Sequence, residues 1–269
     1  MHEKPTRCFK ATVGRLSESS FQGLSRLGES CNSFEVLSVH WRTRIWITLA
    51  IVLAGVSKFA SGQSPMAEPK FQITTPVSQE FQDGFQAAQQ TIPIAVWRRL
   101  ARSGWRVCLA EFVIDAAPEL DGRHPRGWPS DTTWNNTDAA HLSKRQLLVF
   151  AEKRRNRKGE VVATHRVPQV LRHEVGHAFD AVVNDAGGLF SSRADFRAAH
   201  ARDLKQMPIA NRKALAYFAQ SGQSGRQETF AEAFAILLGG GSDSENGDCF
   251  TASFTEVMKL VEQALKKTR

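Results

Sequence analysis

The spacing of hydrophobic positions along the chain changes character near residue 167. Before this point apolar residues occur in short runs typical of buried strands, whereas after it they recur every three to four residues, as on one helix face. The elements predicted for the first part are a helix over 92–103, a strand over 105–115, a loop over 118–136, and a strand pair over 145–152 and 160–166.

Helical spacing dominates the second part of the chain. A helix beginning at Val167 has a buried face that runs to Val182, and Gly187-Gly188 is expected to end it. Further helices are predicted over 194–207, 209–220, 227–238 and 253–267. Strands followed by helices are typical of an α+β domain, so we predict one over residues 79–269, with a small N-terminal sheet and a helical C-terminal half.

The first 62 residues predict a leader that contains a signal peptide. The apolar run Ile45–Val56 follows Arg42 and Arg44 and precedes the small residues Ala60-Ser61-Gly62. A membrane-spanning helix needs about 20 apolar residues, so this shorter run predicts export and no stable membrane span in the mature chain. We therefore expect a secreted or cell-envelope protein.

The leader is unusually long, because about forty residues precede its positively charged flank. A true start near Val36–Val39, at a codon read as Met, would give it ordinary length. Residues 63–78 contain Pro and Ser and predict a linker between the leader and the domain.

Composition and charge narrow the class of partner. Hydrophobic residues make up 42% of the chain and charged residues 23%, as in ordinary globular proteins. The net charge is +8, but much of the excess lies in the leader, and no basic and aromatic array of the nucleic-acid-binding kind is present. The basic run at 153–159 (KRRNRKG) predicts a solvated turn. We expect a protein or peptide substrate, no nucleic acid, and a monomer.

Two cysteines, Cys108 and Cys249, belong to the mature chain. An exported protein could join them in a disulfide, or Cys108 could be a buried thiol in its apolar run, and the sequence leaves both possibilities open. No CxxC pair is present, so a cysteine zinc site has no support.

The motif His173-Glu174-Val175-Gly176-His177 lies inside the helix that begins at Val167. His173 and His177 are four residues apart, so both imidazoles lie on one helix face and can bind one metal ion. Glu174 stands one position round the helix, where a carboxylate can act as general base toward a water molecule. This arrangement predicts one catalytic Zn²⁺ with His173 and His177 as ligands.

A catalytic zinc usually takes three protein ligands, so a third must come from elsewhere. The three-histidine form HExxHxxGxxH is absent, because Asp180 and Val183 occupy its last two defining positions. His141, His165 and His200 stand alone, without a spaced partner, and are disfavoured as ligands.

Two carboxylates downstream are better suited to the third position. Glu228 and Glu232 share one face of the predicted helix over 227–238, and apolar residues form the opposite face. Burying two carboxylates is costly unless a cation or another partner compensates them. The spacing alone does not decide which of the two is the ligand.

HEVGHAFD at 173–180 followed by ETFAEAF at 228–234 resembles the gluzincin peptidases, and in particular the branch that contains anthrax lethal factor and the bacterial Pro-Pro endopeptidases. The resemblance implies a zincin-like fold, Glu228 as the third zinc ligand, and Glu232 as the residue that orients a zinc-binding histidine. That branch also has a tyrosine shortly before the ligand glutamate. Here the single tyrosine, Tyr217, lies eleven residues before Glu228, separated from it by a segment over 221–225 that we expect to be a flexible loop. Tyr217 is either the oxyanion stabiliser or a core aromatic.

These features predict an exported zinc-dependent endopeptidase with Glu174 as general base. One alternative is a non-catalytic, zinc-stabilised binding module of the cell envelope, which could dispense with Glu174. Another is a toxin-like effector protease, which differs only in its substrate. We expect the substrate to extend along an edge strand near residues 160–167, with Trp128 and Trp134 either lining a subsite or packing under their loop.

Overall fold

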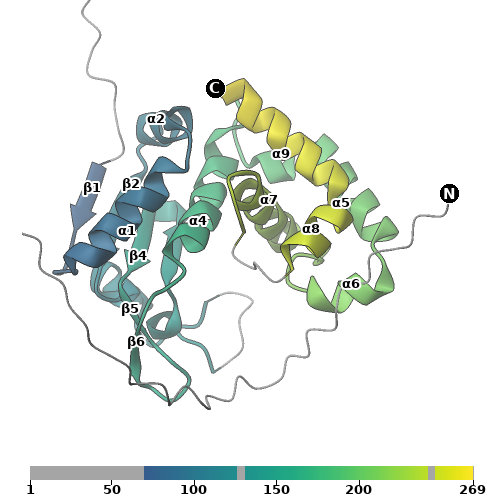
Figure 1. Ribbon diagram of the computed structural model, residues 1–269. Helices are drawn as coiled ribbons and strands as arrows, with labels where there is room; N and C mark the ends of the chain where they lie inside the picture. The colour runs from purple at the N-terminus through teal and green to yellow at the C-terminus, as the bar shows by residue number, and fades with distance from the viewer. Residues whose placement is uncertain (1–69, 126–130, 242–245, 269) are drawn as a thin grey trace, which may run out of the picture. The chain divides into compact units, whose positions relative to one another are not determined.

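The computed structural model describes residues 70–125, 131–241 and 246–268 (Figure 1). The predicted leader over 1–62 and Trp128 lie outside these ranges. None of the helices within them combines the length and apolar character that crossing a membrane requires.

The first half of the domain is built on a four-stranded sheet. In spatial order its strands are β1 (Lys70–Ile73), β2 (Arg106–Ala110), β4 (Leu147–Ala151) and β3 (Ala139–Leu142). β1 and β4 run parallel to β2, whereas β3 runs antiparallel to β4. In this order β1 and β3 are the two edge strands. A separate two-stranded sheet pairs β5 (Lys153–Arg155) with β6 (Val161–Ala163).

Alternate residues of the two central strands supply two different cores. Val107 and Leu148 belong to the main core, which also contains apolar residues of α1 (Gln79–Gln90) and α2 (Ile94–Arg102). Cys108 and Val149 belong to a smaller core on the opposite face, beside α3 (Val113–Ala116). Both faces of β2 and β4 are therefore covered, which explains why their sequences read as continuous apolar runs.

Trp134 packs against the smaller core, as the packing interpretation of this residue expected. It stands in one of four short 3₁₀ turns: Pro118–Leu120, Trp134–Asn136, Ser143–Arg145 and Phe190–Ser192. In the same core Cys108 is a buried free thiol, with its Sγ 2.7 Å from Thr74 Oγ1. A disulfide between Cys108 and Cys249 is therefore absent.

Three expectations for this half need correction. Residues 70–73 lie in the predicted linker but form β1, whose two apolar residues, Phe71 and Ile73, are too few to predict a strand in a segment that contains Pro and Ser. The predicted strand over 105–115 ends at Ala110, and α3 follows it. The predicted pairing of 145–152 with 160–166 is formed only at its end, where the Thr164 N–H donates to the Glu152 carbonyl; β4 pairs with β2 and β3, and β6 pairs with β5 across the basic turn.

The second half is helical, as predicted. Its helices are α4 (Val167–Val182), α5 (Ala194–Gln206), α6 (Ile209–Ala214), α7 (Gln223–Leu237), α8 (Gly247–Ser253) and α9 (Thr255–Thr268). Two bounds differ from expectation: α6 stops before Leu215, and α7 begins at Gln223, inside a segment expected to be a flexible loop. The sheet followed by helices confirms the α+β class.

α4 lies between the two halves and contacts both (Figure 1). It packs against β3, β4 and α1 on one side and against α7 on the other. At the α7 contact a β-carbon on residue 176 would lie 2.8 Å from the Ala231 Cα atom, so only Gly176 permits this approach. The close packing sets the distance between the HExxH helix and the helix that carries Glu228.

The C-terminal turn of α4 is tied to the following segment by Asp180. Its two carboxylate oxygens accept hydrogen bonds from the Ser191 backbone N–H and the Ser191 hydroxyl, each at 2.7 Å. Asp180 is only 1% exposed. Burial disfavours the ionised carboxylate and outweighs these hydrogen bonds, which raises the pKa of Asp180 from 3.8 to about 6.

The raised pKa predicts that Asp180 makes a pH-dependent contribution to the free energy of unfolding. The Asp180→Asn substitution should remove this contribution. Because the folded-state pKa is raised, the contribution is fully present below pH 3.8 and is lost as pH rises through about 6. A shift of this size corresponds to roughly 3 kcal/mol in the free energy of unfolding. Asn can still accept from the Ser191 N–H and donate to its hydroxyl, so the fold should be retained.

The measurement is denaturant unfolding of both proteins between pH 3.5 and pH 7.5 with chelator present. The stability of the wild type relative to the variant should fall across this range. Parallel curves would show that Asp180 does not titrate there.

Candidate metal centre

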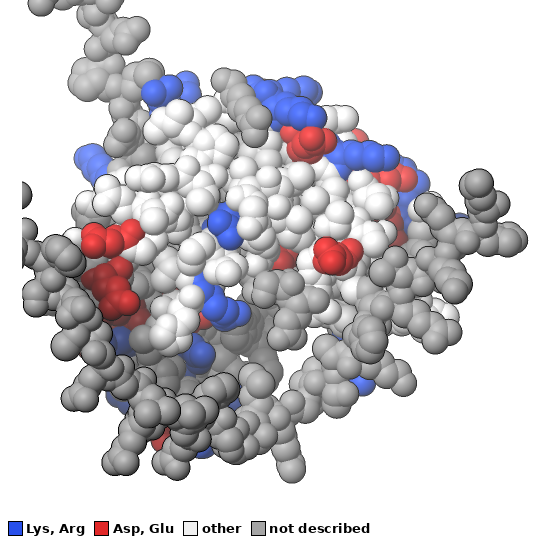
Figure 2. Space-filling model, viewed as in Figure 1, with Lys and Arg blue, Asp and Glu red and all other residues white. Residues whose placement is uncertain are grey.

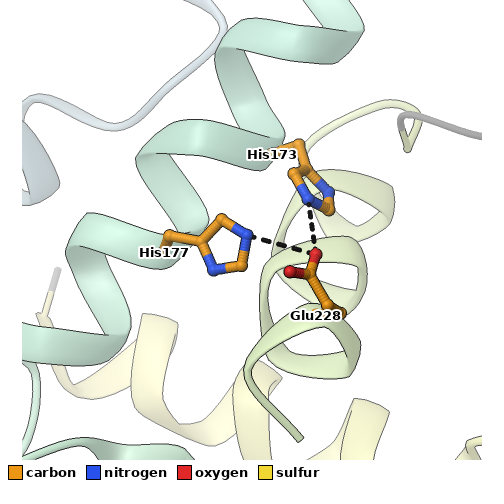
Figure 3. Close-up of side chains that lie close together, drawn as sticks. All are labelled: His173, His177 and Glu228. Atoms are coloured by element: carbon orange, nitrogen blue, oxygen red, sulfur yellow. Dashed lines mark hydrogen bonds and ion pairs between the residues drawn. The ribbon is translucent and has the colours of Figure 1, made fainter. Parts of the chain in front are cut away.

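Three side chains from α4 and α7 converge on one point (Figure 3). Glu228 Oε2 lies 3.2 Å from His173 Nε2 and 3.3 Å from His177 Nε2. The two imidazole planes are nearly perpendicular, at 86°, with ring centroids 4.9 Å apart. Both rings therefore direct their outer nitrogen at the same carboxylate oxygen.

This donor set fits a zinc ion. In a tetrahedral site, bonds of about 2.1 Å place neighbouring ligand atoms about 3.4 Å apart, close to the separations seen here. One ligand-capable atom from each of the three residues lies within 4.8 Å of the other two. Two imidazole nitrogens and one carboxylate suit zinc, and three protein ligands leave a fourth position open.

Glu232 lies behind His173, on the far side of the ring. Its Oε2 is 2.9 Å from His173 Nδ1, and the carboxylate is 1% exposed. A hydrogen bond from Nδ1–H to this carboxylate leaves Nε2 as the nitrogen that can bind a metal. The geometry thus separates the two glutamates, whose roles the spacing alone left open: Glu228 faces both imidazoles, and Glu232 contacts one of them from behind.

The electrostatics of the cluster agree with this division. Burial alone would raise the pKa of Glu228, but the neighbouring imidazoles outweigh it and hold that pKa well below the usual range. For His173 burial has the opposite effect and would lower the pKa, but the hydrogen bonds to Glu228 and Glu232 outweigh burial and raise it. Glu228 is therefore an anionic group in a site that favours positive charge.

Glu174 is next to the cluster and half-buried. Burial is the largest influence on its carboxylate and raises its pKa. Among the described residues no side chain or backbone group is hydrogen-bonded to it. A carboxylate with a raised pKa and an unoccupied acceptor is suited to exchanging a proton with water.

Tyr217 lies in the turn after α6, with its ring edge-on to Phe218. This turn is held against α7, because the Thr229 hydroxyl donates to the Phe218 carbonyl at 2.9 Å. The two residues in this hydrogen bond directly follow Tyr217 and Glu228. The intervening segment is compact: a β-carbon at Gly225 would lie 2.0 Å from the Gln220 carbonyl oxygen, so the flexible loop expected there was wrong.

His141 is a neighbour that the sequence did not reveal. Its ring stacks on His177 with centroids 5.4 Å apart, and burial lowers its pKa to about 3, so the imidazole is neutral. The sequence interpretation set it aside because it had no spaced partner, and the short strand β3 that carries it was not recognised. His165, by contrast, precedes α4 and lies outside the cluster.

No family model matches the chain, and no curated protein matches it. Among solved structures it is similar to the Pro-Pro endopeptidase PPEP-2 from Paenibacillus alvei, with a TM-score of 0.49 and 18% sequence identity. The match covers 72% of this chain and 96% of that one. The chemistry proposed below rests on this chain's own side chains.

The cluster predicts a graded response of metal affinity to substitution. Glu228→Ala should abolish tight zinc binding, because it removes a ligand. Glu232→Gln should keep the site but weaken binding by about 10- to 100-fold, because the anionic acceptor behind His173 is lost. Competition titration with a chromophoric chelator measures both.

Glu262→Gln, which alters an exposed carboxylate paired with Lys266 on α9, is the matched control and should bind zinc like the wild type. Equal affinity in all four proteins would place the metal elsewhere.

Proposed function

We propose that the protein is an exported zinc-dependent endopeptidase. The observation that carries this proposal is the convergence of His173, His177 and Glu228 on one point, with the half-buried carboxylate of Glu174 beside it. Two imidazoles and a carboxylate make a site for one zinc ion, and an adjacent base is what hydrolysis of a peptide bond requires.

The chain's own residues divide the work. Zinc, when bound by His173, His177 and Glu228, supplies a Lewis acid that polarises a carbonyl group and makes water more acidic. Glu174 accepts a proton from the attacking water and passes it to the departing amine. Its raised pKa favours this exchange, since a stronger base accepts the proton more readily. Glu232 keeps His173 in the tautomer that leaves Nε2 free to bind the metal.

The edge of β3 is the best place for an extended substrate. The Ala151 N–H donates to the Asp138 carbonyl, so in the β3–β4 register Ala140 and Leu142 are the positions bonded to β4. The backbone groups of Ala139 and His141 then point to the free edge, and β3 contacts α4. A peptide added there would run past the metal centre. The edge strand expected near residues 160–167 is the alternative, because β6 also has a free edge in its two-stranded sheet.

Charge on the surface is compatible with a peptide substrate. On the face shown in Figure 2, Lys and Arg side chains of the described residues are interspersed with Asp and Glu. They do not form a continuous basic stripe on that face.

Glu174 also weighs against the binding-module alternative. A purely structural zinc site has no use for a half-buried carboxylate that bonds to no described residue, since such a group is costly to keep. The toxin-like alternative shares the same chemistry and differs in substrate. Export rests on the leader sequence alone.

Glu174→Gln tests the mechanism. Turnover of a diverse peptide library should fall by about 10²- to 10⁴-fold, because the amide cannot take the proton from water. Zinc content should stay the same, since Glu174 is not a ligand. Mass spectrometry of the cleaved peptides and metal analysis of the same samples provide the two readouts.

Wild-type cleavage should stop on addition of a chelator and return with zinc. Cleavage that survives either the chelator or the Glu174→Gln change would refute the proposed function, and a wild type that binds zinc but cuts nothing would favour the binding module.

Tyr217→Phe tests the proposal that Tyr217 stabilises the oxyanion. The hydrogen bond from the Thr229 hydroxyl to the Phe218 carbonyl holds the turn that contains Tyr217 next to Glu228, and this supports the role. Loss of the hydroxyl should lower kcat by about 10²- to 10³-fold. The ring is retained, so its packing against Phe218 should be preserved and the protein should still fold. An unaltered kcat would assign Tyr217 to the core instead.

A further inference from the structure

Three aromatic rings from separate segments form a stack beside the metal centre. His141 of β3 lies between Trp105, just before β2, and His177 of α4. Its ring centroid is 5.0 Å from that of Trp105 at an interplanar angle of 17°, and 5.4 Å from that of His177 at 28°. Trp105 is 4% exposed, so the far end of the stack is anchored in the core.

The two metal-binding histidines are held in different ways. His173 Nδ1 is bonded to Glu232, which fixes the orientation of that ring. For His177, no described residue provides a hydrogen bond to Nδ1. Rotation of a histidine ring about its last side-chain bond is soft, so a ligand ring needs some constraint to keep its nitrogen aimed at the metal. The flat face of His141 is the constraint available.

His141 is itself placed by packing. Its Nε2 is buried and has no hydrogen-bond partner among the described residues. Its position comes instead from the strand, where it pairs with Leu148, and from contact with the rings on either side. A buried nitrogen without a hydrogen-bond partner costs free energy, so the contacts with the neighbouring rings and strand must offset this cost.

We infer that His141 is a positioning residue for the metal centre: clamped against Trp105, its ring holds the imidazole of His177 in the orientation that directs Nε2 at the ion. Stacking thus does for His177 what the carboxylate of Glu232 does for His173. This inference rests on the proposed zinc site.

The test is the affinity of the purified protein for Co²⁺, followed by visible absorption, with His141→Phe, His141→Leu and Leu142→Ala. Phe keeps a flat ring without nitrogens, whereas Leu has similar bulk and no ring. Leu142 is on the same strand but packs against the smaller core, so Leu142→Ala is the matched control. Thermal unfolding of the metal-free proteins shows that each variant folds, and His141→Ala serves as a second ring-free variant.

His141→Leu should weaken Co²⁺ binding by roughly 3- to 10-fold, the size of one aromatic contact, while His141→Phe and Leu142→Ala stay within about twofold of the wild type. Equal weakening by Phe and Leu would mean that a nitrogen of His141 acts instead of the stack, and would overturn the inference. Wild-type affinity in the Leu variant would overturn it as well. A wild type that does not bind Co²⁺ would refute the proposed metal site itself.

Discussion

The close approach of α4 and α7 is the constraint on which the site depends. His173 and His177 are brought together by four residues of helix, but Glu228 lies more than fifty residues further along the chain. It reaches them because the backbones of the two helices approach each other closely at Gly176 and Ala231, and no residue larger than glycine fits at position 176. The glycine within the HExxH motif is therefore a packing residue, and the apolar face of α7 provides the core that keeps the helices in contact.

Packing of this kind concentrates charge where water is scarce. Two carboxylates and two imidazoles occupy a small, largely buried volume at the helix contact, where the pKa of His173 is raised and that of Glu228 is lowered. Without a metal ion they compensate each other through hydrogen bonds. A divalent cation would replace those bonds with ligand bonds while leaving the outer contact of His173 with Glu232 intact. The fold thus brings the three proposed ligands together in advance, which would limit the entropic cost of binding an ion.

Local patterns in the sequence were sufficient for the parts of this site that lie on long helices. The HExxH spacing, the paired glutamates and the α+β order all depend on periodicity within one element, and periodicity survives folding. The contacts that could not be predicted from the sequence are those between elements that meet in the sheet. β3 is four residues long, so its alternation is too brief to recognise, and His141 could not be connected to His177 without the β3–β4 register. β1 was missed because it is four residues long and its only apolar residues are Phe71 and Ile73, which is too short an alternation to recognise. The segment around Gly225 was expected to be a loop because glycine and serine are typical of loops, but these residues also occur in the first turn of a helix, as in α7.

The most direct test of this account is anomalous diffraction at the zinc absorption edge from crystals of the zinc-loaded protein. One peak is expected about 2.0–2.2 Å from Nε2 of His173, Nε2 of His177 and a carboxylate oxygen of Glu228, with Glu232 bonded to His173 and not to the ion. A peak at any other group of residues, or none at saturating zinc, would contradict it.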